Sequence, residues 1–263
     1  MAKYKERFFL YLDILGFKEM MKSEERLNEL YEAIDSLNVH KDDAFKTIVF
    51  SDTILVVADE AWNAYPSKAI MWLVEFTQDL FYHLSHRNIH FRAIVTQGEF
   101  TYRSKKNFLS YHGKALVDCY QKEGTIKCCG TFLDQKLARH STIFKLSHFD
   151  KDLCFVHLMQ HLDDISYSYE QYPISGEYLL ATGMEPWVAY LLRYLKIVHA
   201  NANDHNLPSD VRIKFVMTWN MIAKRHDGLL RRLEEAQFDA SKVVTLNWKP
   251  SEKLIGTDDG PWG

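Results

Sequence analysis

The chain has 263 residues, of which 47% are hydrophobic and 25% are charged. These values are ordinary for a globular protein, so a sizeable core is expected and global disorder is disfavoured. The net charge of −3 argues against a strongly basic surface for nucleic acid, and no nucleic-acid partner is expected. No apolar stretch reaches the length of about 18 residues that is needed to span a bilayer. No small-residue cleavage site of a signal peptide follows the N-terminal apolar run. A cytoplasmic protein without a membrane partner is therefore expected.

The cysteines and histidines show no metal-binding spacing. The four cysteines, Cys119, Cys128, Cys129 and Cys154, form no CxxC pair, so reduced thiols are expected and not a zinc site or a disulfide framework.

The first 148 residues alternate between strand and helix patterns. Strand patterns cover 7–15, 45–50, 53–58, 89–100, 128–134 and 144–146, and helix patterns cover 18–37, 67–87 and 113–124. Within the fourth strand pattern, Gly98 is expected to form a turn or bulge. This order predicts an α/β (α+β) fold, in which helices cover one face of a sheet.

The pattern changes after residue 148. A polar, tyrosine-rich stretch at 163–178 precedes two predicted helices at 185–203 and 209–236, and Ser209 is a suitable N-cap for the second. We therefore predict two domains, a sheet-containing domain at 1–148 and a mainly helical C-terminal extension at 149–263.

Two aspartates stand at chemically informative positions. Asp13 ends an apolar strand just before Gly16 and a predicted helix, and Asp52 lies at the tip of the hairpin between the next two strands. If neighbouring strands bring both carboxylates to one edge, they form a site for Mg²⁺ or Mn²⁺, with backbone amides after Gly16 for phosphate. The spacing alone also allows a simpler interpretation, in which Asp13 caps a strand end and Asp52 belongs to a turn.

Four segments in order resemble the catalytic domain of class III nucleotidyl cyclases: FLYLDILGF, FSDTILVV, FRAIVTQGEF and YHGKALVDCYQKEG. They match the family's F-x-D-I-x-G-F segment, its hairpin acid, its R-x-G-I-x-x-G strand and its helix start. The resemblance implies a ferredoxin-type sheet and two Mn²⁺ or Mg²⁺ ions held by Asp13, the Ile14 carbonyl and Asp52. It implies a triphosphate cradle made by the amides of Leu15, Gly16 and Phe17.

The departures from that family concern base recognition and catalysis. Ile48 and Ser110 occupy the two purine-reading positions, and Val117 and Gln121 replace the ribose-orienting asparagine and the transition-state arginine. The chain is therefore either a non-catalytic cyclase-like module or an enzyme that reads a different base. Phe50 shares the strand face of Ile48 and is either a pocket residue or a core aromatic.

An aromatic-Ser-Asp hairpin tip and the chain length resemble the Pycsar pyrimidine cyclases of antiphage defence. That resemblance implies a homodimer with active sites at the interface. It also implies a ribonucleoside triphosphate substrate, preferably UTP and less so CTP, and a cyclic UMP or cyclic CMP product read by a separate effector. The alternatives are an adenylate or guanylate cyclase with atypical base contacts, and a non-catalytic nucleotide-binding module.

Basic residues near the site have two interpretations each. Arg92, in an apolar strand, is either a catalytic residue that contacts phosphate or base, or a member of a structural ion pair. The loop residues Arg103, Lys105 and Lys106 either reach a second subunit or form a solvated face. Lys46 is consistent with a strand-end charge.

Overall fold

The computed structural model describes residues 5–37, 40 and 43–255. The chain forms two compact units. The N-terminal unit comprises Met1–Leu84, Ile89–Ile126 and Gly130–Val156, and the C-terminal unit comprises Ser85–Asn88, Lys127–Cys129 and His157–Gly263. The last strand of the N-terminal unit, β8 (Leu153–Val156), lies beyond the domain boundary predicted at residue 148. All four cysteines are buried free thiols.

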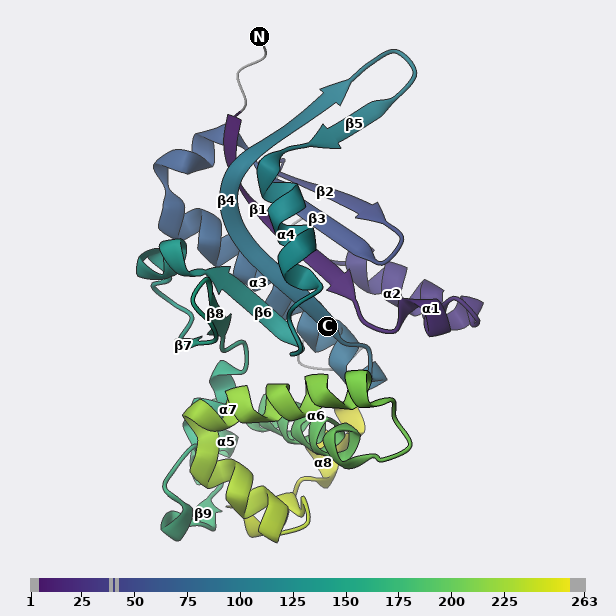
Figure 1. Ribbon diagram of the computed structural model, residues 1–263. Helices are drawn as coiled ribbons and strands as arrows, with labels where there is room; N and C mark the ends of the chain where they lie inside the picture. The colour runs from purple at the N-terminus through teal and green to yellow at the C-terminus, as the bar shows by residue number, and fades with distance from the viewer. Residues whose placement is uncertain (1–4, 38–39, 41–42, 256–263) are drawn as a thin grey trace. The chain divides into compact units, whose positions relative to one another are not determined.

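The N-terminal unit is built on one mixed sheet with strand order β2-β3-β1-β4-β6-β8-β7, and β5 pairs with β4 (Figure 1). Its strands are β1 (Lys5–Ile14), β2 (Phe45–Phe50), β3 (Thr53–Ala58), β4 (Phe91–Ser104), β5 (Leu109–His112), β6 (Gly130–Asp134), β7 (Leu146–His148) and β8. Its helices are α1 (Phe17–Met20), α2 (Glu24–Asp35), α3 (Pro66–Leu84) and α4 (Lys114–Glu123). The β1-α2-β2-β3-α3-β4 connection, with β1 antiparallel to both β3 and β4, confirms the predicted α/β fold and ferredoxin-type sheet.

The two faces of this sheet are covered differently. Strand alternation places Leu10 and Leu12 of β1 on the face that α3 covers, where Phe45 of β2 contacts Trp72 of α3. The other face carries Phe9, Tyr11 and Asp13, and α4 packs on it across β1 and β4 (Figure 1). Helices α2 and α3 therefore cover one face as predicted, and α4 additionally covers part of the opposite face.

Two local predictions are wrong. The helix expected at 18–37 is interrupted, because the Ser23 side chain accepts a hydrogen bond from the Arg26 amide and starts a new helix there. Strand β4 continues through Gly98 to Ser104, so Gly98 is neither a turn nor a bulge. Its role is close packing instead, since a Cβ at this position would lie 2.8 Å from the Ala115 Cβ of α4.

The C-terminal unit is mainly helical, as predicted. Its elements are β9 (Ile174–Ser175), α5 (Glu177–Thr182), α6 (Glu185–Asn203), α7 (Ser209–Glu235), β10 (Val244–Thr245) and α8 (Lys249–Leu254). Helices α6 and α7 pack against each other, and the Thr218 hydroxyl of α7 accepts a hydrogen bond from the Cys129 amide at 2.8 Å. The N-cap of α7 is Pro208 and not Ser209, which is its first helical residue.

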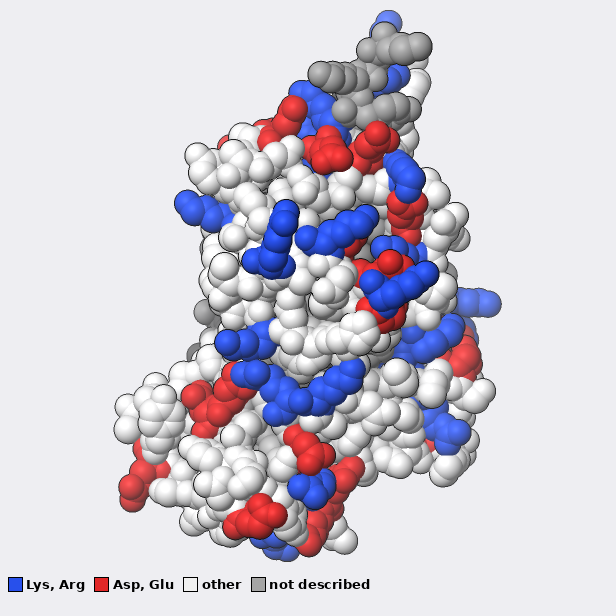
Figure 2. All heavy atoms as spheres, turned by 60° about the vertical axis from the view of Figure 1, so that its left-hand side comes forward, with Lys and Arg blue, Asp and Glu red and all other residues white. Residues whose placement is uncertain are grey.

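Basic and acidic residues are nearly equal in number, and both occur on the surface. On the face shown in Figure 2, basic side chains alternate with acidic and uncharged ones. No helix in the described residues is long and apolar enough to cross a membrane.

Two buried histidines of the C-terminal unit contact each other. The rings of His157 and His226 lie 6.2 Å apart, and His226 has non-helical dihedral angles inside α7. Its Nδ1 lies 2.6 Å from the Ser166 hydroxyl. Burial is the largest cause that lowers the pKa of each histidine to about 4, so both are neutral in the folded protein at pH 7.

We expect acidification to destabilise this unit. The unfolded chain, with a histidine pKa of about 6.5, binds protons before the folded chain does, so stability is lost as the pH falls from about 6.5 towards 4. Thermal unfolding between pH 7.5 and 5 measures the effect, and His157→Gln should flatten the pH dependence. His148→Gln, at an exposed position, is the control and should leave the slope unchanged. Equal slopes in His157→Gln and the wild type would contradict the assignment.

Candidate active site

Asp13 and Asp52 lie at the same end of the sheet. Asp13 pairs with Thr53 across β1 and β3, and the Ile14 amide donates a 2.8 Å hydrogen bond to the Asp52 carbonyl. Burial raises the pKa of Tyr11, and the negative charges of Asp13 and Asp52 add to that shift. The hairpin tip that presents Asp52 is tight, with Ser51 in the left-handed region at φ 55°.

Arg92 joins Asp13 to a second carboxylate. Its Nη2 lies 3.1 Å from Asp13 Oδ2 and also forms an ion pair with Glu123, the last residue of α4. Its Nη1 donates 3.0 Å hydrogen bonds to the carbonyls of Glu123 and Ile126. Arg92 and Glu123 are each 8% exposed. Of the two interpretations of Arg92, the structure shows the ion pair; direct contact with substrate remains a prediction.

Sequence reasoning did not find Glu123. One signal was available, since Glu123 precedes Gly124 at the predicted end of a helix. An acid in the last turn opposes the helix dipole and so calls for a cationic partner. Which cation it meets depends on the packing of α4 against β4, which the sequence pattern does not contain.

The oxygen ligands at this edge fit a hard divalent cation. Mg²⁺ and Mn²⁺ prefer carboxylate and carbonyl oxygens, and Asp13 and Asp52 lie at this edge. The Ile14 carbonyl as a third ligand stays a prediction. The described residues contain no group of three or more histidine, cysteine or acidic side chains that could hold a metal. A cation would therefore take its remaining ligands from water or from substrate phosphates.

At Gly16, the turn after β1 has a backbone conformation that suits a phosphate cradle. Gly16 has φ 75°, a conformation that favours glycine, and it is the N-cap of α1. The Leu15 amide, however, donates a 2.8 Å hydrogen bond to the His90 carbonyl. The prediction that Leu15, Gly16 and Phe17 all bind phosphate is therefore corrected for Leu15, and it now depends on the amides of Gly16 and Phe17.

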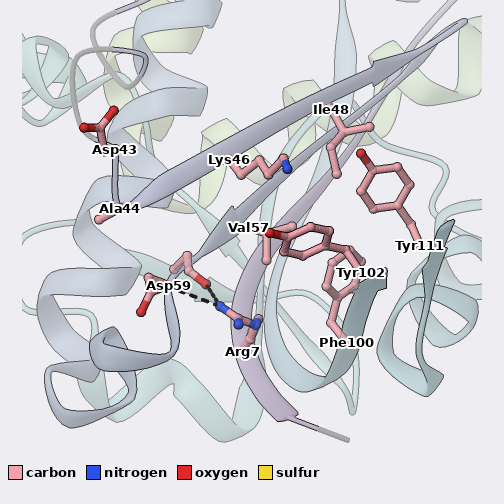
Figure 3. A pocket seen from close by; sticks show the side chains of 11 residues that line it. Arg7, Asp43, Ala44, Lys46, Ile48, Val57, Asp59, Phe100, Tyr102 and Tyr111 are labelled. Atoms are coloured by element: carbon pink, nitrogen blue, oxygen red, sulfur yellow. Dashed lines mark hydrogen bonds and ion pairs between the residues drawn. The ribbon is translucent and has the colours of Figure 1, made fainter. Parts of the chain in front are cut away.

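A cavity of about 230 Å³ lies on the same sheet face, at the opposite end of β1 (Figure 3). It is lined by Arg7, Asp43, Ala44, Lys46, Ile48, Val57, Ala58, Asp59, Phe100, Tyr102 and Tyr111. Of the three predicted base-contacting residues, Ile48 lies in this cavity and Phe50 and Ser110 do not.

The strand register explains this division. Ser110 pairs with Arg103, whereas Tyr111 pairs with Tyr102, so Tyr111 and not Ser110 shares the cavity face. Phe50 pairs with Thr53 beside the carboxylates and is 77% exposed, which excludes the core-aromatic interpretation. Lys46, Tyr102 and Tyr111 were missed as cavity residues, although the period of two already placed Lys46 on the face of Ile48.

Two of the four positions that depart from the cyclase pattern, Val117 and Gln121, lie on the outer face of α4. Val117 is 53% exposed and Gln121 is exposed. The basic residues Arg103, Lys105 and Lys106, around the turn of the β4–β5 hairpin, are exposed as well. In Figure 1 this hairpin extends beyond the rest of the sheet.

Comparison with known proteins gives structural neighbours only. No protein-family model and no curated protein sequence matches the chain. The adenylyl cyclase CyaB from P. aeruginosa is similar with a TM-score of 0.44 and 8% identity over 59% of this chain and 95% of that one. The GTP-bound guanylate cyclase domain of RhGC from Catenaria anguillulae has a TM-score of 0.44 and 15% identity, over 59% and 98% of the chains.

A class III adenylyl cyclase-like ATP-binding protein from Pseudomonas aeruginosa is similar at a TM-score of 0.39 and 14% identity. This alignment covers 54% of this chain and 36% of that one. Similarities this low do not assign a function, so any assignment must come from the residues of the site.

The charge on Glu123 should control how well Asp13 binds a cation. Glu123→Gln keeps the side-chain shape but removes one of the two negative charges that Arg92 contacts. The Arg92 charge is then balanced by Asp13 alone, so the affinity of Asp13 for Mn²⁺ should fall about tenfold. Electron paramagnetic resonance titration of free Mn²⁺ measures this directly. Asp118→Asn, which neutralises a more exposed acid on the same helix, is the matched control. Unchanged Mn²⁺ affinity in a folded Glu123→Gln protein would disprove the charge sharing.

Proposed function

We propose that this protein is a nucleotidyl cyclase that converts a ribonucleoside triphosphate into a 3′,5′-cyclic nucleotide and pyrophosphate. The position of Asp13 and Asp52 at the same end of the sheet, beside the Gly16 turn, is the observation that carries the proposal. Such a site suits the chemistry, because attack of a ribose hydroxyl on the α-phosphate builds up charge that oxygen-bound metal ions neutralise. The order of the resembling segments on a ferredoxin-type sheet supports it further.

In this proposal each residue of the site has a distinct task. Asp13 and Asp52 would hold Mn²⁺ or Mg²⁺, two ions per site, and such ions would supply positive charge for the attacking hydroxyl and the leaving pyrophosphate. The amides of Gly16 and Phe17 orient the triphosphate. Arg92, held by Glu123 and two carbonyls of the chain, positions Asp13 and so is a positioning residue.

The separation of the carboxylates from the cavity supports a homodimer. Arg7 at the cavity and Asp13 at the metal site are six residues apart in β1, or about 20 Å. A second copy related by a two-fold axis would bring its cavity to the carboxylates of the first, and the reverse. The N-terminal unit exposes large aromatic side chains that suit such an interface, among them Phe50 at 77%, Tyr102 at 46% and Phe108 at 61%.

Pyrimidine specificity is part of the proposal. Ile48 provides an apolar wall in the cavity where purine cyclases have a polar base-reading residue, so we favour UTP, with CTP second. The resemblance to Pycsar cyclases suggests that the cyclic nucleotide activates a separate effector in antiphage defence, from a cytoplasmic enzyme. A purine cyclase with atypical base contacts remains the alternative within the enzyme class.

One observation favours a second candidate, a nucleotide-binding module without catalysis. The outer face of α4 carries Val117 and Gln121 where active cyclases have an asparagine and an arginine. Without those side chains, the ribose and the transition-state charge lack two of their usual contacts.

Incubation with each of the four ribonucleoside triphosphates and Mn²⁺ tests these candidates. We expect cyclic UMP, with less cyclic CMP, and a loss of at least about a hundredfold in Asp52→Ala, since the variant removes a metal ligand. The half-exposed hairpin position of Asp52 should leave the melting temperature nearly unchanged. Asp35→Ala, which removes an exposed acid at the end of α2, is the control. Cyclic AMP or cyclic GMP as the one product would refute pyrimidine specificity, and nucleotide binding without product would favour the non-catalytic module.

Mixing two inactive variants tests the shared sites. Asp52→Ala lacks the metal site, and Ile48→Trp fills the cavity, so a heterodimer contains one intact composite site. Random exchange of subunits should restore about a quarter of wild-type activity. If each site lay within one subunit, the mixture would stay inactive. Analytical ultracentrifugation of both variants must first show that they form dimers.

A further inference from the structure

Lys46 is the basic residue that faces the aromatic part of the cavity. Its Nζ lies 4.2 Å from the centre of the Tyr102 ring, and the rings of Tyr102 and Tyr111 lie 6.4 Å apart at an interplanar angle of 28°. In Figure 3 the ammonium group points towards these two rings, with Ile48 beside them. This part of the cavity therefore combines flat aromatic walls with the cationic donor Lys46.

The other cation of the cavity is already bound within the chain. Arg7 donates a 3.1 Å hydrogen bond to the Ala58 carbonyl and lies 3.9 Å from the Asp59 carboxylate. Among the described residues, no carboxylate lies within ion-pair distance of Lys46, whose recorded contact is the Tyr102 ring. A cation over an exposed ring is held weakly, so the Lys46 ammonium can turn to a ligand at small cost.

The donor and acceptor pattern of this group discriminates between pyrimidines. A lysine ammonium donates three hydrogen bonds and accepts none. Uracil presents a carbonyl acceptor at C4, whereas cytosine presents an amine donor there, which would face another donor. Both rings can stack on Tyr102 or Tyr111, so stacking does not separate them.

From this arrangement we propose that Lys46 is a specificity-determining residue that selects uracil over cytosine by donating to the C4 carbonyl. The proposal rests on the proposed cyclase function and places the base of one subunit's triphosphate in the cavity of its partner. It deepens that function by deciding between UTP and CTP, which Ile48 does not do.

Competition between equal concentrations of UTP and CTP with Mn²⁺ tests the proposal in the full-length protein. Lys46→Met should lower kcat/KM for UTP about tenfold or more and leave that for CTP nearly unchanged, because a charge-assisted hydrogen bond is lost for UTP alone. Lys46→Gln, whose amide both donates and accepts, should raise the share of cyclic CMP.

Lys68→Met is the matched control. Lys68 also lies over a tyrosine ring, at 5.5 Å from that of Tyr65, but outside the cavity. It should keep the wild-type ratio of cyclic UMP to cyclic CMP. A ratio that stays at the wild-type value in both Lys46 variants would overturn the proposal.

A different result would show that the proposed cyclase function fails. If the wild type forms no cyclic nucleotide, the cyclase proposal fails, and the dissociation constants of UTP and CTP measured by calorimetry then decide the role of Lys46. A preference for UTP that disappears in Lys46→Met but persists in Lys68→Met would support base reading by Lys46 in a non-catalytic module. Equal binding of both nucleotides by the wild type, or no binding of either, would overturn it.

Discussion

The buried guanidinium of Arg92 is the interaction on which the candidate site depends. A buried cation without partners would be strongly destabilising, so its burial requires the carboxylates of Asp13 and Glu123 and the two carbonyls at the end of α4. Through these contacts one side chain connects β1, β4 and α4. Strand pairing fixes the backbone of Asp13, and its carboxylate shares Arg92 with Glu123 of α4.

Strand register also places the carboxylate of Asp13 and the cavity on one face of the sheet. Helix α3 fills the opposite face with apolar side chains, whereas α4 covers the face of Asp13 across β1 and β4 and approaches β4 closely at Gly98. The region over β2 and β3 keeps Phe50 exposed and leaves room for the cavity around Lys46 and Ile48. A sheet face that is only partly covered by its own helix suits an interface with a second copy.

Much of the fold followed from periodicity. The predicted ranges for β2, β3 and α6 agree with the observed elements, because each is a continuous apolar pattern with clear ends. Predictions that depended on one residue fared worse. Gly98 indicated a turn, but a glycine also permits close approach of a helix, and only the contact with Ala115 distinguishes the two. Ser23 is an N-cap in the middle of a continuous helical pattern, where a local hydrogen bond outweighs the periodicity.

The sequence by itself determined the ferredoxin-type order of elements and the glycine between the first strand and helix. It also determined that one aspartate lies near the end of β1 and another at the tip of the next hairpin. These are local features, since strand alternation and turn chemistry act between residues that are close along the chain. The tertiary structure alone decided that Glu123 meets Arg92, that the Leu15 amide is bound to His90, and that Tyr111 rather than Ser110 faces the cavity. Each of these depends on strand register or on helix packing between residues distant in sequence, and a one-residue change of register reverses which side chain faces the site.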